Sequence, residues 1–338
     1  MKALLANDAS LAGHHGSALV TEQIVTLAAK FGISVCSGKR WEAVESLLNG
    51  GSEFDLLIVN GEGSLHHDSR SAKRIAEIGL RAKSIGLPAY LINTTEEANS
   101  AEVLSGIAAF RKVYARDTTT QSRLTSIGIE AGFVPDLTLS WIDARRYEPQ
   151  NVILVTDSSD AQKTDRLLQI ARTIGASTQA ISFRAPPPLL SRRLQFEFKR
   201  LLAMALPTAP WTVRYSASVR TRNQLVEKMR RAKGVICGRY HAVCFCLLLR
   251  VPFIAIPGNT KKIDSLLGDI GLSRRLIDLQ RLIDCSKSLG NSYHKLIPNF
   301  DSRELELIED FTMRARIRAE SMFREIAMDA SGLRVAEK

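Results

Sequence analysis

The sequence predicts an α/β protein with two Rossmann-like domains, and three observations predict this class. Short apolar runs of strand length alternate with helix-length segments along most of the 338 residues. Some of these runs are apolar at consecutive positions, as in Asp55–Val59, which is typical of parallel strands covered on both faces. The chain is too long for one ordinary core. We therefore expect domains at 1–147 and 148–300, then a C-terminal helix and tail at 301–338 that packs across them.

The first predicted domain begins with a strand at 2–6 and a loop that contains His14 and His15. The pattern then predicts helices at 17–31, 41–48, 71–85, about 100–109 and 118–126, and strands at 33–36, 55–59, 89–92, 112–115 and 131–134. Asn60-Gly61-Glu62-Gly63-Ser64 directly follows a strand, so we expect a loop there. The periodicity lapses at 141–150, which we interpret as a linker.

The second domain repeats the same alternation. Strands are expected at 151–155, 178–183, 234–237 and 251–256, and helices at 161–174, 242–249 and after Lys262. Asp301 and Glu304 have the spacing of a capping box at the start of a long final helix. Its apolar positions, 308, 311, 315, 319, 322 and 326, predict one buried face.

The positive charge is confined to the second half. The chain carries 46 Lys and Arg against 35 Asp and Glu; residues 1–147 have a net charge of −1 and the remainder +12. Much of the excess lies at 191–233, where either a solvated helical face or a surface for anionic lipid or lipid-linked pyrophosphate fits the pattern. Nucleic acid is disfavoured as a partner, because aromatic residues are only 6% and no RNA-binding or zinc-finger signature is present.

Other features argue for a cytoplasmic protein, with contact at the inner face of the membrane through 191–233. The five cysteines are odd in number and lie mostly in apolar runs, which favours reduced thiols. No uncharged apolar run reaches 18 residues, and the apolar N-terminal stretch is too short for a signal peptide. No metal or cofactor is expected; His66-His67-Asp68 favours a solvated helix start over a metal site.

The stretch with the strongest chemical character is Gly238-Arg239-Tyr240-His241-Ala242, between an apolar strand and an apolar helix. Such a strand–turn–helix points free N–H groups and the positive end of the helix dipole above the sheet. Arg239 adds a cationic fork and His241 a group that titrates near neutral pH. Lys261 and Lys262 follow the next strand. The site suits an anion that is both held and protonated.

This pattern resembles the C-terminal half of the polysaccharide pyruvyltransferase family, on Arg239, His241, Pro252 and Lys261 or Lys262. Upstream, Val113–Asp117, Gly128-Ile129 and Val134-Pro135-Asp136 are similar to the family's Arg-Asp and Pro-Asp segments. Asn60–Ser64 stands where the family carries glycines. The resemblance extends from about Asp55 to Leu272.

The resemblance implies a GT-B-like arrangement of two domains facing a cleft. It also implies transfer of a pyruvyl group from phosphoenolpyruvate to a sugar of a cell-surface polysaccharide or its lipid-linked precursor, forming a ketal. That chemistry needs a general acid, for which we choose His241, and fixed cations, for which we choose Arg239 and one of the two lysines. His14-His15-Gly16-Ser17 departs from the family's pattern, which suggests a different acceptor or donor. Glu62 departs from the family's run of glycines, which argues against phosphate binding there and favours contact with acceptor hydroxyls.

Several assignments stay open at this point. Arg116 is either a second anion contact or an internal ion pair with Asp117. The segment Asn60, Gly61, Glu62, Gly63 and Ser64 either contacts substrate or forms a tight turn. His14 or His15 is a base or part of a polar surface loop.

Two other functions compete with pyruvyl transfer. One is a GT-B glycosyltransferase that uses a nucleotide-activated sugar. The sequence shows no clear base-binding loop or carboxylate for it, and Asp157 and Glu227 are the residues that stay open for this role. The other is a non-catalytic glycan-binding protein of the same fold.

Overall fold

The computed structural model describes residues 1–8, 10, 13–37, 41–51, 53–142, 150–182, 194–195, 198, 201, 219, 221–289 and 296–332. The chain divides into two compact units. The first comprises Met1–Leu11, Leu19–Trp141 and Phe311–Lys338, and the second Ala12–Ala18 and Ile142–Asp310. The first turn of helix α1 (His15–Ala29) therefore groups with the second unit, and the final helix divides between both.

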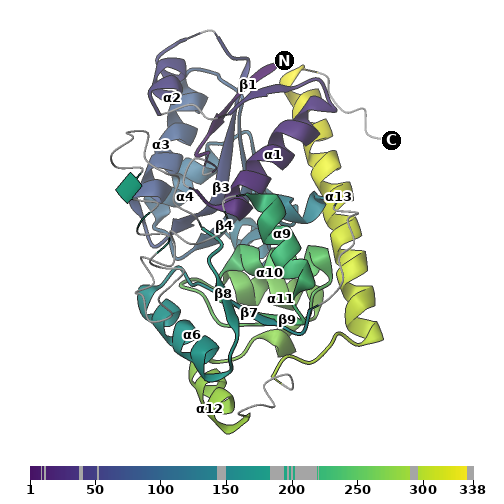
Figure 1. The fold of residues 1–338 in the computed structure, drawn as a ribbon. Coiled ribbons are helices and arrows are strands. Elements are labelled where there is room, and N and C mark those ends of the chain that lie inside the picture. Colours follow the sequence, from purple (N-terminus) through teal and green to yellow (C-terminus); the bar gives the residue numbers. More distant parts are fainter. Residues whose placement is uncertain are drawn as a thin grey trace. The chain divides into compact units, whose positions relative to one another are not determined.

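The first unit contains a parallel six-stranded sheet in the order β2-β1-β3-β4-β5-β6 (Figure 1). Its strands are β1 (Lys2–Ala6), β2 (Ser34–Cys36), β3 (Leu56–His66), β4 (Ala89–Glu97), β5 (Lys112–Ala115) and β6 (Ala131–Phe133). Helices α2 (Trp41–Leu48), α3 (Arg70–Ser84), α4 (Ala101–Ala108) and α5 (Thr118–Ser126) connect them, and a 3-10 turn at Leu137–Ser140 follows.

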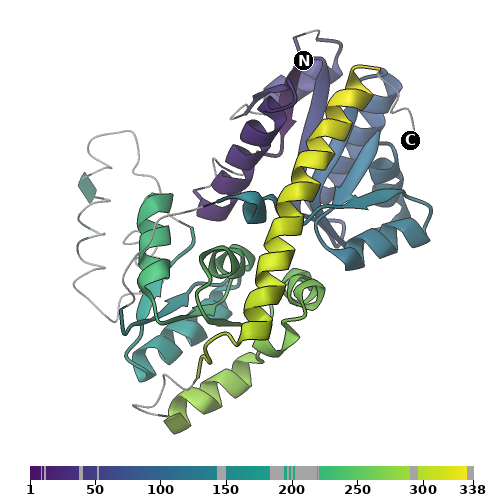
Figure 2. The same cartoon turned by 90° about the vertical axis from the view of Figure 1, so that its right-hand side faces the viewer.

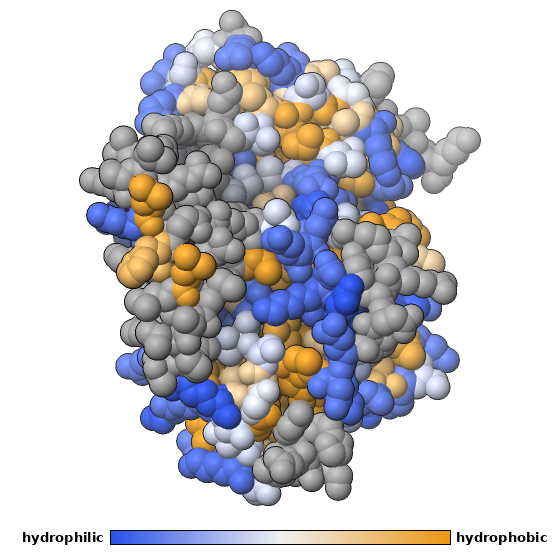
Figure 3. Space-filling model, in the orientation of Figure 1, coloured by the Kyte–Doolittle hydropathy of each residue, from blue (hydrophilic) through white to orange (hydrophobic). Residues whose placement is uncertain are grey.

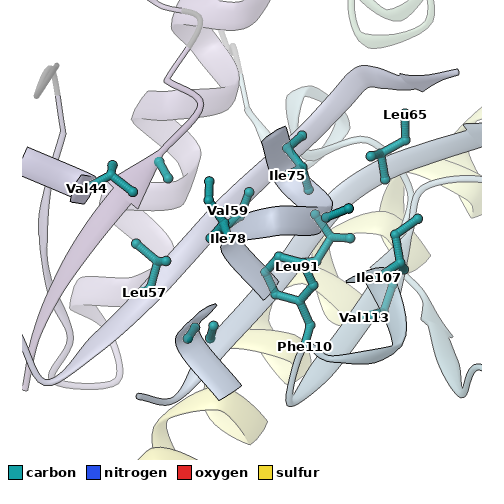
Figure 4. Close-up of a cluster of buried hydrophobic side chains, with 14 of the residues drawn as sticks. Val44, Leu57, Val59, Leu65, Ile75, Ile78, Leu91, Ile107, Phe110 and Val113 are labelled. Carbon is teal, nitrogen blue, oxygen red and sulfur yellow. The ribbon is translucent and has the colours of Figure 1, made fainter. Parts of the chain in front are cut away.

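Alternate residues of the central strands supply two separate cores. Leu57 and Val59 face α3 and α4 in a cluster that includes Ile75, Ile107 and Phe110 (Figure 4). Leu56 and Ile58 belong to a second cluster with α1 and the last turns of the final helix. Because both faces are covered, the first halves of the central strands are apolar at consecutive positions, as the sequence predicts for β3.

One prediction in this unit is wrong. Asn60–Ser64 is not a loop, because β3 continues through it to His66 and pairs with β4 as far as Glu97. The pairing shifts between Glu62 and Leu65, and Glu62 has a left-handed φ of 44°. At position 61 this strand requires glycine, because a Cβ there would lie 2.4 Å from Oγ1 of Thr94 on β4. Gly61 therefore allows β3 and β4 to pack closely, and it does not form a turn.

The second unit contains a parallel four-stranded sheet in the order β10-β9-β7-β8. Its strands are β7 (Ile153–Thr156), β8 (Ser177–Gln179), β9 (Gly234–Cys237) and β10 (Phe253–Ala255). The helices are α6 (Ala161–Thr173), α9 (Arg222–Arg231), α10 (Tyr240–Leu249), α11 (Lys262–Ile270) and α12 (Leu279–Leu289). Helix α10 is apolar all round and almost wholly buried, as expected of a helix inside a core.

The final helix α13 (Ser302–Ala330) is continuous over 29 residues (Figure 2). Its capping box is present: Glu304 N–H donates to Asp301 Oδ1 at 2.8 Å, and Asp301 N–H donates to Glu304 Oε2 at 3.2 Å. All the apolar positions predicted to form its inner face are buried: Ile308, Phe311, Ala315, Ala319, Met322 and Ile326. The predicted partition set 301–338 apart, whereas Phe311–Lys338 groups here with the first unit.

The surface of the described residues is largely hydrophilic on the face shown in Figure 3, with apolar side chains exposed in small separate patches. None of the five cysteines, all of which the structure describes, forms a disulfide. Among the described residues, no helix has the length and apolar character that crossing a bilayer requires. Nor does this part of the chain contain a group of three or more His, Cys, Asp or Glu side chains able to hold a metal ion.

Candidate functional site

The candidate site in the second unit begins with an ion pair at the ends of two neighbouring strands. Arg239 follows β9 and Asp157 follows β7, and these strands are paired in parallel. Arg239 Nε donates to Asp157 Oδ2 at 2.5 Å, and the Ile181 N–H donates to Asp157 Oδ1 at 2.8 Å. Asp157 thus holds the guanidinium in a fixed direction at the carboxyl edge of the sheet, where open α/β sheets bind ligands.

Directly before Arg239, the backbone at Gly238 packs closely against the end of β7. Gly238 N–H donates to Thr156 Oγ1 at 2.9 Å, and a Cβ on Gly238 would lie 2.5 Å from the Asp157 carbonyl oxygen. Gly238 is therefore required for the close approach of the two strand ends. Arg239 then occupies the N-cap position of α10 without a side-chain capping bond, so its guanidinium serves the ion pair.

His241, in the first turn of α10, lies against the loop that follows β1 in sequence. Its ring is 5.1 Å from that of His14, centroid to centroid, in an edge-to-face arrangement. A Cβ on Gly16 would lie 2.2 Å from His241 Cγ, so only glycine allows this packing. The loop is fixed by a β-bridge between His14 and Ser182 and by a bond from the His15 N–H to the Ile181 carbonyl at 3.2 Å.

The ionisation of His14 reflects these neighbours. Burial lowers its pKa well below the usual 6.5, and the charges of His241, Arg239, His15 and Lys262 lower it further. His14 is therefore neutral at pH 7. The charges of Arg239, His241 and Lys262 all act on His14, so these four residues form the candidate site.

His15 has a different environment from His14. Its Nε2 lies 3.0 Å from the Val219 carbonyl oxygen, and its side chain is buried. Burial lowers its pKa, and the charge of Arg222 adds to that effect, while the bond to Val219 opposes it. These contacts anchor the loop.

The two predicted lysines also differ. Lys261 is exposed at the N-cap of α11, whereas Lys262 is half-buried and its charge acts on His14. The loop before them is braced by Lys163, whose Nζ donates to the Pro257 and Gly258 carbonyls at 2.8 and 2.9 Å. Its partial burial and the effect of its charge on His14 favour Lys262, and its place in the site stays a prediction.

In the first unit, Arg116 follows β5 and is fully buried. It donates through its guanidinium to Asp136 at 2.8 Å and through Nε to Thr95 Oγ1 at 2.8 Å. The Asp117 carboxylate instead caps α5 by accepting from the Thr120 N–H at 2.7 Å. These contacts describe an internal ion pair, with Asp136 as the partner where the sequence suggested Asp117.

The predicted segment Asn60–Ser64 is tied to its neighbouring strands. Asn7 Nδ2 donates to the Asn60 carbonyl at 2.6 Å and to Ser64 Oγ at 3.1 Å, and Asn93 Nδ2 donates to Asn60 Oδ1 at 3.1 Å. Asn60, Gly61 and Glu62 are buried, and Gly63 and Ser64 are half-buried. A substrate contact by this segment stays a prediction.

The predicted basic surface at 191–233 lies mostly outside the described residues. In its described part, Lys228 Nζ donates to Gln179 Oε1 at 3.0 Å, and Arg231 pairs with Glu227 at 2.9 Å on α9. Glu227 is thus engaged on its own helix.

Sequence reasoning missed three features that build the site. It placed His14 in the first domain, although the loop groups with the second unit. Sequence reasoning also overlooked the role of Gly16. The only sign of that role in the sequence is that this glycine directly follows His14 and His15. Lys163 was overlooked as well, because nothing along the sequence connects a helical lysine with carbonyls of the Pro257–Gly258 loop.

Comparison with known proteins identifies the family of this chain. The family model for polysaccharide pyruvyl transferase matches residues 16–260. No curated protein sequence matches the chain. Among solved structures, a putative UDP-N-acetylglucosamine 2-epimerase from Listeria monocytogenes is similar at 9% identity, with a TM-score of 0.54, over 99% of this chain and 97% of that one. The UDP-GlcNAc 2-epimerase of Methanocaldococcus jannaschii, in complex with UDP-GlcNAc and UDP, is similar at 12% identity, with a TM-score of 0.50, over 92% of this chain and 99% of that one.

The two parallel sheets and these structural neighbours define an α/β protein of the GT-B class, which confirms the predicted fold class. Because the family model covers more than half of the chain, the protein belongs to the polysaccharide pyruvyl transferase family, which is a family of transferases. The resemblance noted in the sequence is thereby confirmed.

Proposed function

We propose that this protein transfers the pyruvyl group of phosphoenolpyruvate to two hydroxyls of a sugar and forms a ketal. Family membership supports the transferase class. The observation that carries the choice of donor is the cluster of Arg239, His241, His14 and Lys262 around the ends of β7, β9 and β10. It combines fixed positive charge with imidazole groups, as an anionic donor that must be protonated requires.

The reaction assigns a role to each group. His241 gives a proton to C3 of the enolpyruvyl unit, so that C2 becomes electrophilic. The first sugar hydroxyl adds to C2, and its proton passes to the phosphate, which leaves with the C–O bonding electrons. The second hydroxyl then closes the ring at C2, and its proton returns to the deprotonated His241. Arg239 and Lys262 neutralise the phosphate and carboxylate throughout, and Asp157 keeps the Arg239 fork in place.

The donor is tested by thermal shift and calorimetry of the whole protein with phosphoenolpyruvate, UDP and UDP-sugars. A ligand at 100 times its Kd stabilises the folded state by about 2.7 kcal/mol. We expect stabilisation by phosphoenolpyruvate that Arg239→Ala abolishes. The control is Arg250→Ala, whose arginine makes an exposed pair with Glu309. Stabilisation by UDP or a UDP-sugar alone overturns the proposal in favour of a glycosyltransferase.

The role of His241 is tested by separating binding from turnover. We expect His241→Ala to bind phosphoenolpyruvate with nearly unchanged affinity and to lose phosphate release with a panel of glycan acceptors, because a general acid contributes roughly 10²- to 10⁴-fold. A variant that loses donor binding and folding together shows instead that His241 is structural.

For the acceptor, we propose a glycan or its lipid-linked precursor, met at the cytoplasmic face of the membrane. The support is the cationic sequence at 191–233 and the exposure of the apolar residues described within it, Leu194, Phe198 and Leu201. Binding to vesicles that contain anionic lipid, compared with neutral vesicles, tests this part of the proposal separately from the donor.

A further inference from the structure

We propose that His14 is a neutral hydrogen-bond donor to the bound phosphoenolpyruvate, through its Nε2–H, and not the base of the reaction. This inference rests on the proposed function for the identity of the ligand. It rests on the geometry of the loop and of α1 for the role of the imidazole. Neither the family nor the fold assigns a role to this histidine.

His14 is the N-cap residue of α1. The Ala18 N–H donates to the His14 carbonyl at 2.9 Å, which is the first helical bond, and the Ser17 N–H donates to His14 Nδ1 at 3.3 Å. A ring nitrogen that accepts a hydrogen bond carries no proton, so the neutral ring holds its hydrogen on Nε2. The capping bond therefore fixes the tautomer and leaves Nε2–H on the opposite side of the ring.

A second proton would have to enter at Nδ1. It would break the capping bond and place a positive charge at the positive end of the α1 dipole. The charged and titratable groups around the ring oppose it as well: His15 on the same loop, Arg239 and His241 at the start of α10, and Lys262 at the start of α11. The carboxylate of Asp157 is bonded to Arg239 and to the Ile181 N–H. Burial and these charges explain why the His14 pKa is far below 6.5.

The tautomer decides what the ring does in the reaction. A neutral imidazole with its hydrogen on Nε2 donates from that nitrogen and takes no proton there, so it does not deprotonate a sugar hydroxyl. The cations close to it attract an anion, and the phosphate and carboxylate oxygens of the donor accept hydrogen bonds. The His241 ring, 5.1 Å away, supplies the proton, while His14 holds an oxygen of the same molecule.

Two amide substitutions separate the capping function from the donor function. Asn carries its amide oxygen two bonds beyond Cβ, as His carries Nδ1, and it is among the best N-cap residues. Gln carries its amide nitrogen three bonds beyond Cβ, as His carries Nε2. His14→Asn therefore keeps the cap and loses the donor, whereas His14→Gln keeps a donor in place of Nε2–H.

The test measures phosphoenolpyruvate binding by calorimetry for the wild type and both variants. We expect His14→Asn to retain the wild-type Tm and to bind roughly 10- to 100-fold more weakly, as for a lost hydrogen bond to a charged group. We expect His14→Gln to bind within about fivefold of the wild type. Equal loss in both variants, or no loss in His14→Asn, overturns the donor role.

A second measurement needs no ligand. Imidazole ¹⁵N NMR of the whole protein, with the His14 signals assigned by their absence in His14→Asn, reports tautomer and protonation directly. We expect a neutral ring with the hydrogen on Nε2 throughout pH 6 to 8, as the direction of the pKa shift requires. Protonation in that range, or hydrogen on Nδ1, overturns the inference. A wild type that binds no phosphoenolpyruvate overturns the proposed function and the ligand assigned here, while the NMR result still decides the state of the ring.

Discussion

Two Arg–Asp pairs occupy equivalent places in the two units, but their environments differ. Arg116 follows β5 and pairs with Asp136, which follows the adjacent β6. Arg239 follows β9 and pairs with Asp157, which follows the adjacent β7. In both cases a cation and a carboxylate meet at the carboxyl ends of paired parallel strands. Local sequence and topology do not distinguish the pairs.

Burial and neighbours do distinguish them. The side chains of Arg116 and Asp136 are 2% and 0% exposed, and they also hydrogen-bond to Thr95 and Thr138 respectively. The Arg239 side chain is 18% exposed, and it lies close enough to His14 to affect its ionisation. Removal of one partner from a fully buried pair is strongly destabilising, because it leaves an uncompensated buried charge. A partly exposed pair beside two histidines is instead a candidate for ligand binding.

The largest effect is expected from Arg116→Ala. It leaves the Asp136 charge buried without its cation, which costs about 3 kcal/mol or more in free energy of unfolding. Urea unfolding measures the loss. Below the unfolding transition the variant should bind phosphoenolpyruvate normally; weaker binding with unchanged stability would move Arg116 into the site.

A pair of glycine substitutions sharpens the comparison. Gly61→Ala crowds Thr94 in the first unit and Gly238→Ala crowds the Asp157 carbonyl in the second. Overpacking of this kind costs about 1–3 kcal/mol in either case. Only Gly238→Ala should also weaken phosphoenolpyruvate binding, because it displaces Asp157 and with it Arg239. Calorimetry on both variants decides this; equal binding in the two contradicts it.

Asp157→Asn removes charge from the exposed pair with little change in shape. The amide oxygen can still accept from the Ile181 N–H, so we expect a stability loss of about 1 kcal/mol. Without its carboxylate, Arg239 is less well oriented, and the Kd for phosphoenolpyruvate should rise about tenfold, or 1.4 kcal/mol. A tighter Kd would show that the Asp157 charge repels the donor and does not position Arg239.

The most gradual expected effect is a pH dependence of stability. His14 and His15 have lowered pKa values when folded, so below about pH 6.5 the unfolded chain binds more protons than the folded one. Stability therefore falls as pH drops below that value, by at most about 1.4 kcal/mol per pH unit for each histidine. His14→Asn should flatten the dependence, as measured by urea unfolding between pH 5 and 7. An unchanged slope would contradict the assignment to His14.

The sequence by itself determined most of the fold. Strand-length apolar runs and helical periodicity predicted most of the elements, from β1 at Lys2–Ala6 to the buried face and capping box of α13, but not helices α9 and α12. They succeeded because burial on both faces of a parallel sheet leaves a local signal in each element. They failed at Asn60–Ser64, where a glycine that is needed for contact with Thr94 has the same local signature as a glycine in a turn.

The sequence also determined the chemical character of the site, because Arg239 and His241 follow one strand and Lys262 the next. Only the tertiary structure decided that His14 lies against His241, that Asp157 holds Arg239, and that Arg116 is sealed against Asp136. Each of these contacts joins side chains from separate elements of the chain. Which side chains meet is set by strand order and loop path, and those follow from packing of the whole unit and not from any local pattern.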